Sequence, residues 1–114
     1  MRLIDRIKDR ARKNPQKIVL AEGEEERIMQ AAVISLREGV AFPVLLGNAE
    51  RIRDLARLLA LNLDGIGIID PETSPEIRKY VPLYIQSRGG KRVTEGMAER
   101  LIRRPLYFGA IMVR

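Results

Sequence analysis

Apolar residues near the start of the chain first recur every three to four positions and then run together. The recurring positions are Leu3, Ile4, Ile7 and Ala11. Charged residues lie between them, so the spacing predicts an amphipathic helix. Asn14 ends it because a residue before proline disfavours the helical conformation. Residues 17–21 then form an almost continuous apolar run, which is typical of a buried strand.

A second helical pattern occupies residues 26–38, and Gly39 is well placed as its C-terminal cap. Its apolar positions are Ile28, Ala31, Ala32 and Ser35 on one side, with Met29, Val33 and Leu36 extending the stripe. So wide a stripe predicts a helix that is covered on more than one side.

Residues 42–46 predict the second strand, and residues 66–69 the third. Pro43 is expected at a strand start, because proline donates no hydrogen bond to a ladder. Between these strands, Asn48 is placed to cap a helix. The inward-facing residues of that helix are Ile52, Leu55, Ala56 and Leu59.

Strands and helices alternate three times with short connections. This order predicts an α/β domain of three layers, with a mostly parallel sheet, helices on both faces and right-handed crossovers. The chain of 114 residues is long enough for one core, and it contains no repeat or low-complexity linker. We therefore expect a single domain over residues 1–114.

The last third of the chain is less regular. Residues 74–76 provide a cap, a proline and an acid at the start of a helix, which Pro82 should kink and residues 89–90 should stop. One face of this helix carries Ile77, Val81, Tyr84, Ile85 and Arg88. Thr94 is placed to cap another helix, and residues 106–113 are strongly apolar. The inward residues of the helix after Thr94 are Met97, Leu101 and Ile102.

The composition excludes several kinds of catalytic and metal site. The chain has no cysteine and no histidine, which excludes disulfides, thiolate metal sites, cysteine nucleophiles and histidine-dependent triads. No apolar run approaches the roughly 20 residues that cross a bilayer, and residues 1–14 lack the apolar segment of a secretory signal. We expect a cytoplasmic protein with no membrane partner.

The formal net charge of +6 permits an anionic partner. The arginines are spread along the chain, apart from Arg100, Arg103 and Arg104, and most are interpreted as solvating helix faces. Interleaved aromatic residues and a recognition motif are missing, so no nucleic-acid partner is expected. A small phosphorylated metabolite is another class of anionic partner that this charge permits.

Two segments are candidates for chemistry. Residues 22–26 hold four glutamates in the turn after the first strand, where they cap and solubilise a helix or contact a metal or substrate. They would repel a pyrophosphate, and the glycine patterns of dinucleotide and P-loop sites are absent. Arg88 ends an apolar face beside two glycines, and Lys91 and Arg92 add positive charge. Its guanidinium either binds phosphate in a bidentate manner, or its stem packs on the core edge while its head reaches water.

Five segments, taken in order, resemble the phosphate acetyltransferase/phosphate butyryltransferase family. They are residues 17–27 (KIVLAEGEEER), 38–41 (EGVA), 45–48 (LLGN), 68–73 (IIDPET) and 107–113 (YFGAIMV). The resemblance covers the whole chain and implies that it is the N-terminal third of a longer enzyme.

The resemblance also implies a reaction, which is acyl transfer between an acyl phosphate and coenzyme A. In the family, the thiol of coenzyme A attacks the carbonyl, a carboxylate acts as base and arginines hold the phosphate. It implies two α/β domains with the active site between them, a homodimer, and coenzyme A or acetyl-CoA as substrate with no covalently bound cofactor. Only Arg88 matches one of the family's site residues, as a contact to phosphate or coenzyme A. The other site residues are expected beyond Arg114, so no catalytic residue is assigned.

Two alternatives remain. Some bacterial malic enzymes carry a regulatory domain similar to this family after their dehydrogenase part. The chain could also be a non-catalytic binding or dimerisation module. We expect the chain to be inactive alone and to self-associate, because a parallel sheet with an unpaired edge and an apolar C-terminal segment invites pairing.

Overall fold

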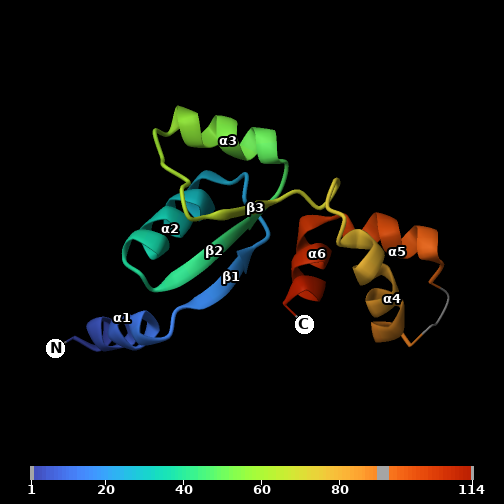
Figure 1. The fold of residues 1–114 in the computed structure, drawn as a ribbon, viewed down its shortest axis with the longest axis horizontal. Coiled ribbons are helices and arrows are strands. Elements are labelled where there is room, and N and C mark those ends of the chain that lie inside the picture. The colour runs from blue at the N-terminus through green and yellow to red at the C-terminus, as the bar shows by residue number, and fades with distance from the viewer. Residues whose placement is uncertain (1, 90–92, 114) are drawn as a thin grey trace.

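The computed structural model describes residues 2–89 and 93–113, whose helices and strands follow the predicted order as far as α5 (Figure 1). The apolar segment near the C-terminus, for which no element was predicted, forms a further helix. The elements are α1 (Leu3–Lys13), β1 (Gln16–Leu20), α2 (Glu26–Arg37), β2 (Ala41–Leu46), α3 (Ala49–Leu58), β3 (Gly67–Ile69), α4 (Ile77–Ser87), α5 (Glu95–Ile102) and α6 (Pro105–Met112). Most boundaries fall within a residue or two of the prediction. The start of α4 is the largest difference, because residues 74–76 form a turn and the helix begins at Ile77.

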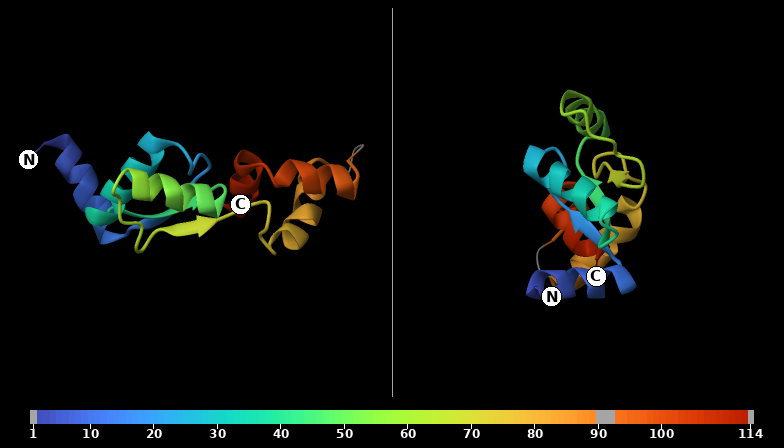
Figure 2. Two further views of the ribbon diagram at one scale, coloured as in Figure 1. Left: turned by 90° about the horizontal axis from the view of Figure 1, so that it is seen from above. Right: turned by 90° about the vertical axis from the view of Figure 1, so that its left-hand side faces the viewer.

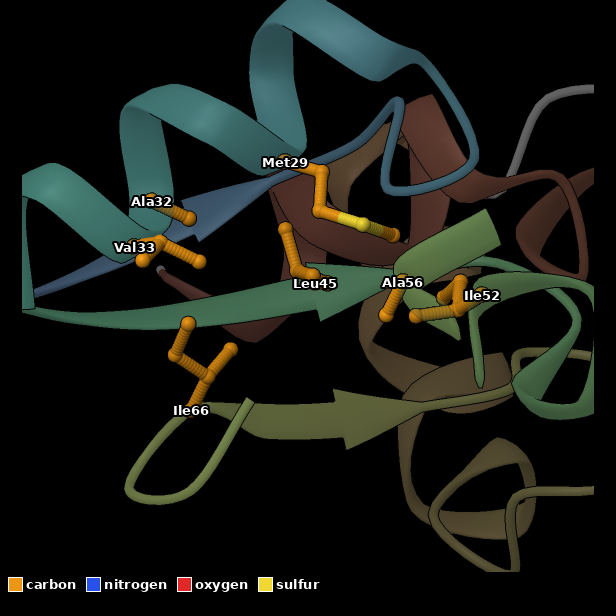
Figure 3. Packing of buried hydrophobic residues seen from close by; sticks show 7 residues of the cluster. All are labelled: Met29, Ala32, Val33, Leu45, Ile52, Ala56 and Ile66. Atoms are coloured by element: carbon orange, nitrogen blue, oxygen red, sulfur yellow. The ribbon is translucent and has the colours of Figure 1, made fainter. Parts of the chain in front are cut away.

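The three strands are parallel and lie in the order β1-β2-β3, which confirms the predicted parallel sheet. Two right-handed crossovers that move in one direction across a sheet place their helices on the same face. α2 and α3 do pack together on one face of the sheet, over Leu45 (Figure 3). The buried residues of this first cluster are Met29, Ala32, Val33, Leu45, Ile52, Ala56 and Ile66.

The opposite face is covered by helices from the last third of the chain. Neighbouring residues of a strand point to opposite faces, so Val44 and Leu46 point away from Leu45 and enter a second cluster. Its buried members are Val44, Leu46, Ile77, Ile102, Phe108 and Ile111, and the ring of Tyr80 packs edge-on against Phe108 at 5.1 Å between centroids. The three-layer α/β class is therefore confirmed. Figure 2 shows α4, α5 and α6 gathered on the side toward which the strands point.

The prediction that β1 is a buried strand is wrong. In the described part of the chain β1 is the outermost strand of the sheet, its first three residues are exposed, and the side chain of Ile18 is 44% exposed. An apolar run resembles a central strand in sequence, but the order of strands decides which one lies outermost.

The wide apolar stripe on α2 also predicted that more of the helix surface is buried than the structure shows. Ala31 and Ile34 are exposed, and α2 buries only Met29, Ala32 and Val33. Its main contacts are with the central strand β2, on one side of the helix. The inward face of α5 likewise differs, because Met97 is exposed whereas Ala98 and Ile102 are buried.

Pro43 lies inside β2 rather than at its start, and it is buried opposite Ile18 of β1. β2 is the central strand, but its ladder with β3 begins only at Val44. At Pro43 the strand therefore has a partner on one side alone. The missing N–H group is tolerated because proline fits where one side of a strand needs no donor.

Candidate functional site

The loops that follow the three strands are joined to one another by backbone hydrogen bonds. The N–H of Gly23 donates to the carbonyl of Leu46 at 2.9 Å, and the N–H of Gly47 donates to the carbonyl of Ile69 at 3.1 Å. These bonds link the end of β1 to β2 and the end of β2 to β3. They hold the carboxyl edge of the sheet, which is where ligands of open α/β sheets bind.

Two of the glutamates in the turn after β1 are occupied by structural contacts. The carboxylate of Glu25 accepts a hydrogen bond from the N–H of Ile28 at 2.9 Å and caps α2. The carboxylate of Glu24 accepts from the N–H of Asn48 at 3.1 Å and lies 3.7 Å from the guanidinium of Arg51. The capping interpretation of this turn is confirmed for Glu25, whereas Glu24 joins the turn to the start of α3. In the described part of the chain, no group of three acidic side chains is arranged to hold a metal ion.

Two adjoining hollows lie at the carboxyl end of β1. The larger, of about 640 Å³, is a groove between the end of β1 and the start of α6. Its lining residues are Val19, Leu20, Ala21, Glu22, Ile28, Arg104, Pro105, Leu106 and Tyr107. The smaller, of about 480 Å³, reaches from Pro105 across residues 21–25 to Leu46. Both hollows are lined by Ala21, Glu22 and Pro105, so they form one continuous concave surface.

Arg104 supplies a positive charge to this surface, and sequence reasoning missed it. The residue immediately precedes Pro105, the first residue of α6, and its guanidinium carbon lies 5.9 Å from the centroid of the Tyr107 ring. Its place in a cluster of three arginines indicated only a solvated helix face. A proline at the first position of an apolar helix indicates a helix start, but no local signal places that start opposite β1.

Arg88 stands apart from these hollows. It ends α4, its side chain is exposed, and it is not among the residues that line the groove or its neighbour. Another hollow, of about 580 Å³, lies between α4 and α5 and extends along α4 only to Gln86. Residues 90–92, including Lys91 and Arg92, lie outside the described residues. The assignment of Arg88 to phosphate or coenzyme A stays a prediction.

Tyr80 is not suited to act as a base. Burial, and to a smaller extent the negative charge of Glu76, raises the pKa of its phenol above the ordinary value. It therefore remains protonated at neutral pH, as expected for a core or rim residue.

Within residues 2–89 and 93–113, no helix is both long and apolar enough to span a bilayer.

Comparison with known proteins places this arrangement in one family. A family model described as phosphate acetyl/butaryl transferase matches residues 2–114. The phosphate acetyltransferase of Thermoanaerobacterium thermosaccharolyticum is 41% identical over all 114 residues, which span 34% of that protein. The phosphate acetyltransferase of Clostridium acetobutylicum is 36% identical, again over the whole chain and 34% of the relative.

Solved structures agree with the sequence relatives. A phosphotransacetylase from Staphylococcus aureus superposes with a TM-score of 0.90 at 34% identity, covering 97% of this chain and 33% of that one. A phosphotransacetylase from Streptococcus pyogenes also gives 0.90, at 28% identity, with 99% and 35% covered. The chain thus spans about a third of the length of these four proteins, and it belongs to the phosphate acetyl/butaryl transferase family.

Proposed function

We propose that this chain provides the first part of a cytoplasmic, homodimeric acyltransferase that exchanges an acetyl group between coenzyme A and phosphate. The family match over residues 2–114 is the observation that carries the proposal. In the reaction, a phosphate oxygen bonds to the carbonyl carbon of acetyl-CoA, the carbon–sulfur bond breaks, and the thiol leaves with a proton. Acetyl phosphate and coenzyme A are the products.

The substrates fit the charges of the chain. Phosphate, acetyl phosphate and coenzyme A are all anionic, and the chain carries a net charge of +6. We assign Arg88 to a substrate phosphate because it matches an arginine of the family's site, and a guanidinium can bind phosphate through two parallel hydrogen bonds. Arg104, which lies beside the groove at the end of β1, is a second candidate for an anion contact. The resemblance implies a carboxylate base, which would be contributed by the remaining part of such an enzyme.

The test uses the 114-residue chain alone and joined to the remainder of a relative. We expect the chain alone not to form acetyl phosphate from acetyl-CoA and phosphate. A chimaera in which it replaces the matching segment of the Thermoanaerobacterium relative should restore the reaction. The two segments are 41% identical over 114 residues, and the family model matches this chain from residue 2 to residue 114. A folded chimaera without activity, or robust turnover by the chain alone, would contradict the proposal.

The role of Arg88 is tested within the active chimaera. Arg88→Ala should lower kcat/KM for phosphate by roughly 10- to 100-fold, since a hydrogen bond to a charged group is worth about 1.5–3 kcal/mol. Arg88→Lys should recover only part of this loss, because lysine lacks the planar fork. Arg100→Ala is the matched control, as Arg100 is an exposed arginine of α5. Equal kcat/KM values for the Arg88 and Arg100 variants would remove Arg88 from the site.

A further inference from the structure

Two tyrosine rings meet edge to face where α4 packs against α6. The rings of Tyr84 and Tyr107 have centroids 6.4 Å apart and planes at 87° to each other. In such a pair the positive edge of one ring meets the negative face of the other, so the contact is directional. Arg104 lies over the same Tyr107 ring, with its guanidinium carbon 5.9 Å from the centroid. Tyr107 therefore contacts both an arginine of the groove and the second half of α4.

The last turn of α4 is tied to Tyr84 through its backbone. Arg88 follows α4 directly, and its N–H donates to the carbonyl of Tyr84 at 3.1 Å. The hydroxyl of Ser87 donates to the same carbonyl at 2.6 Å. Residues four apart on a helix lie on one face, so Arg88 leaves α4 on the face that Tyr84 presents to α6. The position of Arg88 therefore depends on how Tyr84 is held.

The same face of α4 is held to α6 at a second point, one turn earlier. There the ring of Tyr80 packs on Phe108 inside the second cluster. Tyr107, by contrast, is 37% exposed, so its contact with Tyr84 lies at the rim of the core. A misplacement of about 1 Å in a binding group can lower a reaction rate by roughly a hundredfold. The rim contact can thus matter for Arg88 without being required for folding.

We propose that Tyr84 and Tyr107 are positioning residues, whose contact fixes the last turn of α4 and thereby holds the guanidinium of Arg88 in place for an anionic substrate. The inference rests on the proposed function, because it takes from it the contact between Arg88 and a substrate phosphate. Arg104 helps to orient the Tyr107 ring, since a cation is attracted to an aromatic face. In this role neither tyrosine touches the substrate or transfers a proton.

Activity of the chimaera provides the first test. Tyr84→Leu and Tyr107→Leu should each lower kcat/KM for phosphate by about 2- to 10-fold, which is the effect expected for the loss of one aromatic pair. Tyr84→Phe and Tyr107→Phe keep the rings and should stay within about twofold of the unmodified chimaera. Tyr80→Leu is the matched control on the same helix. It should lower the midpoint of unfolding but leave kcat/KM of the folded protein within about twofold.

Combination with Arg88→Ala separates positioning from a general effect on the fold. Because Tyr84→Leu acts through Arg88, it should cause no further loss of kcat/KM when Arg88 is already alanine. A fully additive loss, or full activity of Tyr84→Leu beside an impaired Arg88→Ala, would overturn the inference and leave the proposed function standing. If Arg88→Ala itself keeps full activity, both the assignment of Arg88 and this inference fail.

Hydrogen exchange tests the contact in the 114-residue chain, without an active chimaera. Tyr107→Leu should raise the exchange rate of the Arg88 amide by about fivefold or more and leave that of Leu45 in β2 unchanged, because only the last turn of α4 loosens. Tyr107→Phe should exchange like the unmodified chain. An unchanged rate at Arg88 in Tyr107→Leu, or an equal increase at Leu45, would overturn the inference that this ring pair holds the turn.

Discussion

At the scale of single residues, Gly23 shows how one small side chain holds the carboxyl edge together. A Cβ atom at this position would lie 2.7 Å from the carbonyl oxygen of Leu46 and 2.9 Å from the Cβ of Leu45. The turn can approach β2 closely enough for the hydrogen bond from Gly23 to Leu46 only because that atom is missing. Gly96 in α5 differs, because a methyl group at this position would meet nothing within 4 Å.

We expect Gly23→Ala to lower the free energy of unfolding by about 1–3 kcal/mol, since backbone must move and the hydrogen bond to Leu46 is weakened. Gly96→Ala should leave stability unchanged or raise it by up to about 1 kcal/mol, because alanine is the better helix former. The midpoints of urea unfolding measure both. If the two alanine variants unfold at the same midpoint, the close approach at Gly23 does not contribute to the free energy of unfolding.

At the scale of elements, α1 differs from every helix that covers the sheet. None of its residues is buried, and its apolar side chain at Leu3 is 73% exposed. It is held to the end of α2 by polar contacts: the amine of Lys8 lies 3.2 Å from the carboxylate of Glu38, and Nε of Arg12 donates to the Glu38 carbonyl at 2.8 Å. The predicted amphipathic helix is therefore confirmed as a helix, while its apolar face has no cover in the described part of the chain.

Hydrogen exchange should report this difference directly. A helix of 11 residues is marginal in water without packing of its apolar face. We expect the amides of α1 to exchange through local opening, with protection at least about a hundredfold lower than that of β2, whose Leu45 and Leu46 are fully buried. Equal protection of α1 and β2 would mean that α1 unfolds only with the whole molecule.

At the scale of the whole molecule, β2 joins two cores that the sheet separates. Leu45 enters the cluster under α2 and α3, whereas Val44 and Leu46 enter the cluster with α4, α5 and α6. Phe108 of α6 is the largest side chain fully buried in the second cluster, and it contacts the ring of Tyr80 from α4. This ring therefore contributes a large part of the apolar surface that the second cluster buries.

The two phenylalanines of the chain make a matched pair for testing this dependence. Phe108→Ala should cost about 3–5 kcal/mol, the usual range for removing a buried ring. Phe42→Ala should cost less than about 1 kcal/mol, because Phe42 is 54% exposed. Thermal unfolding followed by circular dichroism measures both. A loss of similar size in the two variants would show that the second cluster does not hold α6 to the sheet.

Much of this architecture was predictable from local patterns. Periodicity located the helices and strands from α1 to α5, and the short connections predicted parallel pairing. It did not identify α6, whose residues are apolar on every side. Caps such as Asn48 and Thr94 accept hydrogen bonds from Arg51 and Met97 as expected. These features depend on residues within a turn or two of each other along the chain. The candidate site was harder to predict from the sequence. Residues 22–26 were identified as a candidate, but the partners of Glu24 lie 24 or more positions away along the chain.

What the sequence determined by itself is the identity and order of the elements from α1 to α5, because hydrophobic period, prolines and caps act over short stretches of backbone. Only the tertiary structure decided that β1 lies at the edge, that Pro43 is tolerated inside β2 and that Arg104 faces the groove at the end of β1. Each of these depends on which segments distant in sequence meet across the sheet. A pattern of apolar residues predicts that one face of an element is buried, but it does not predict which other element covers that face.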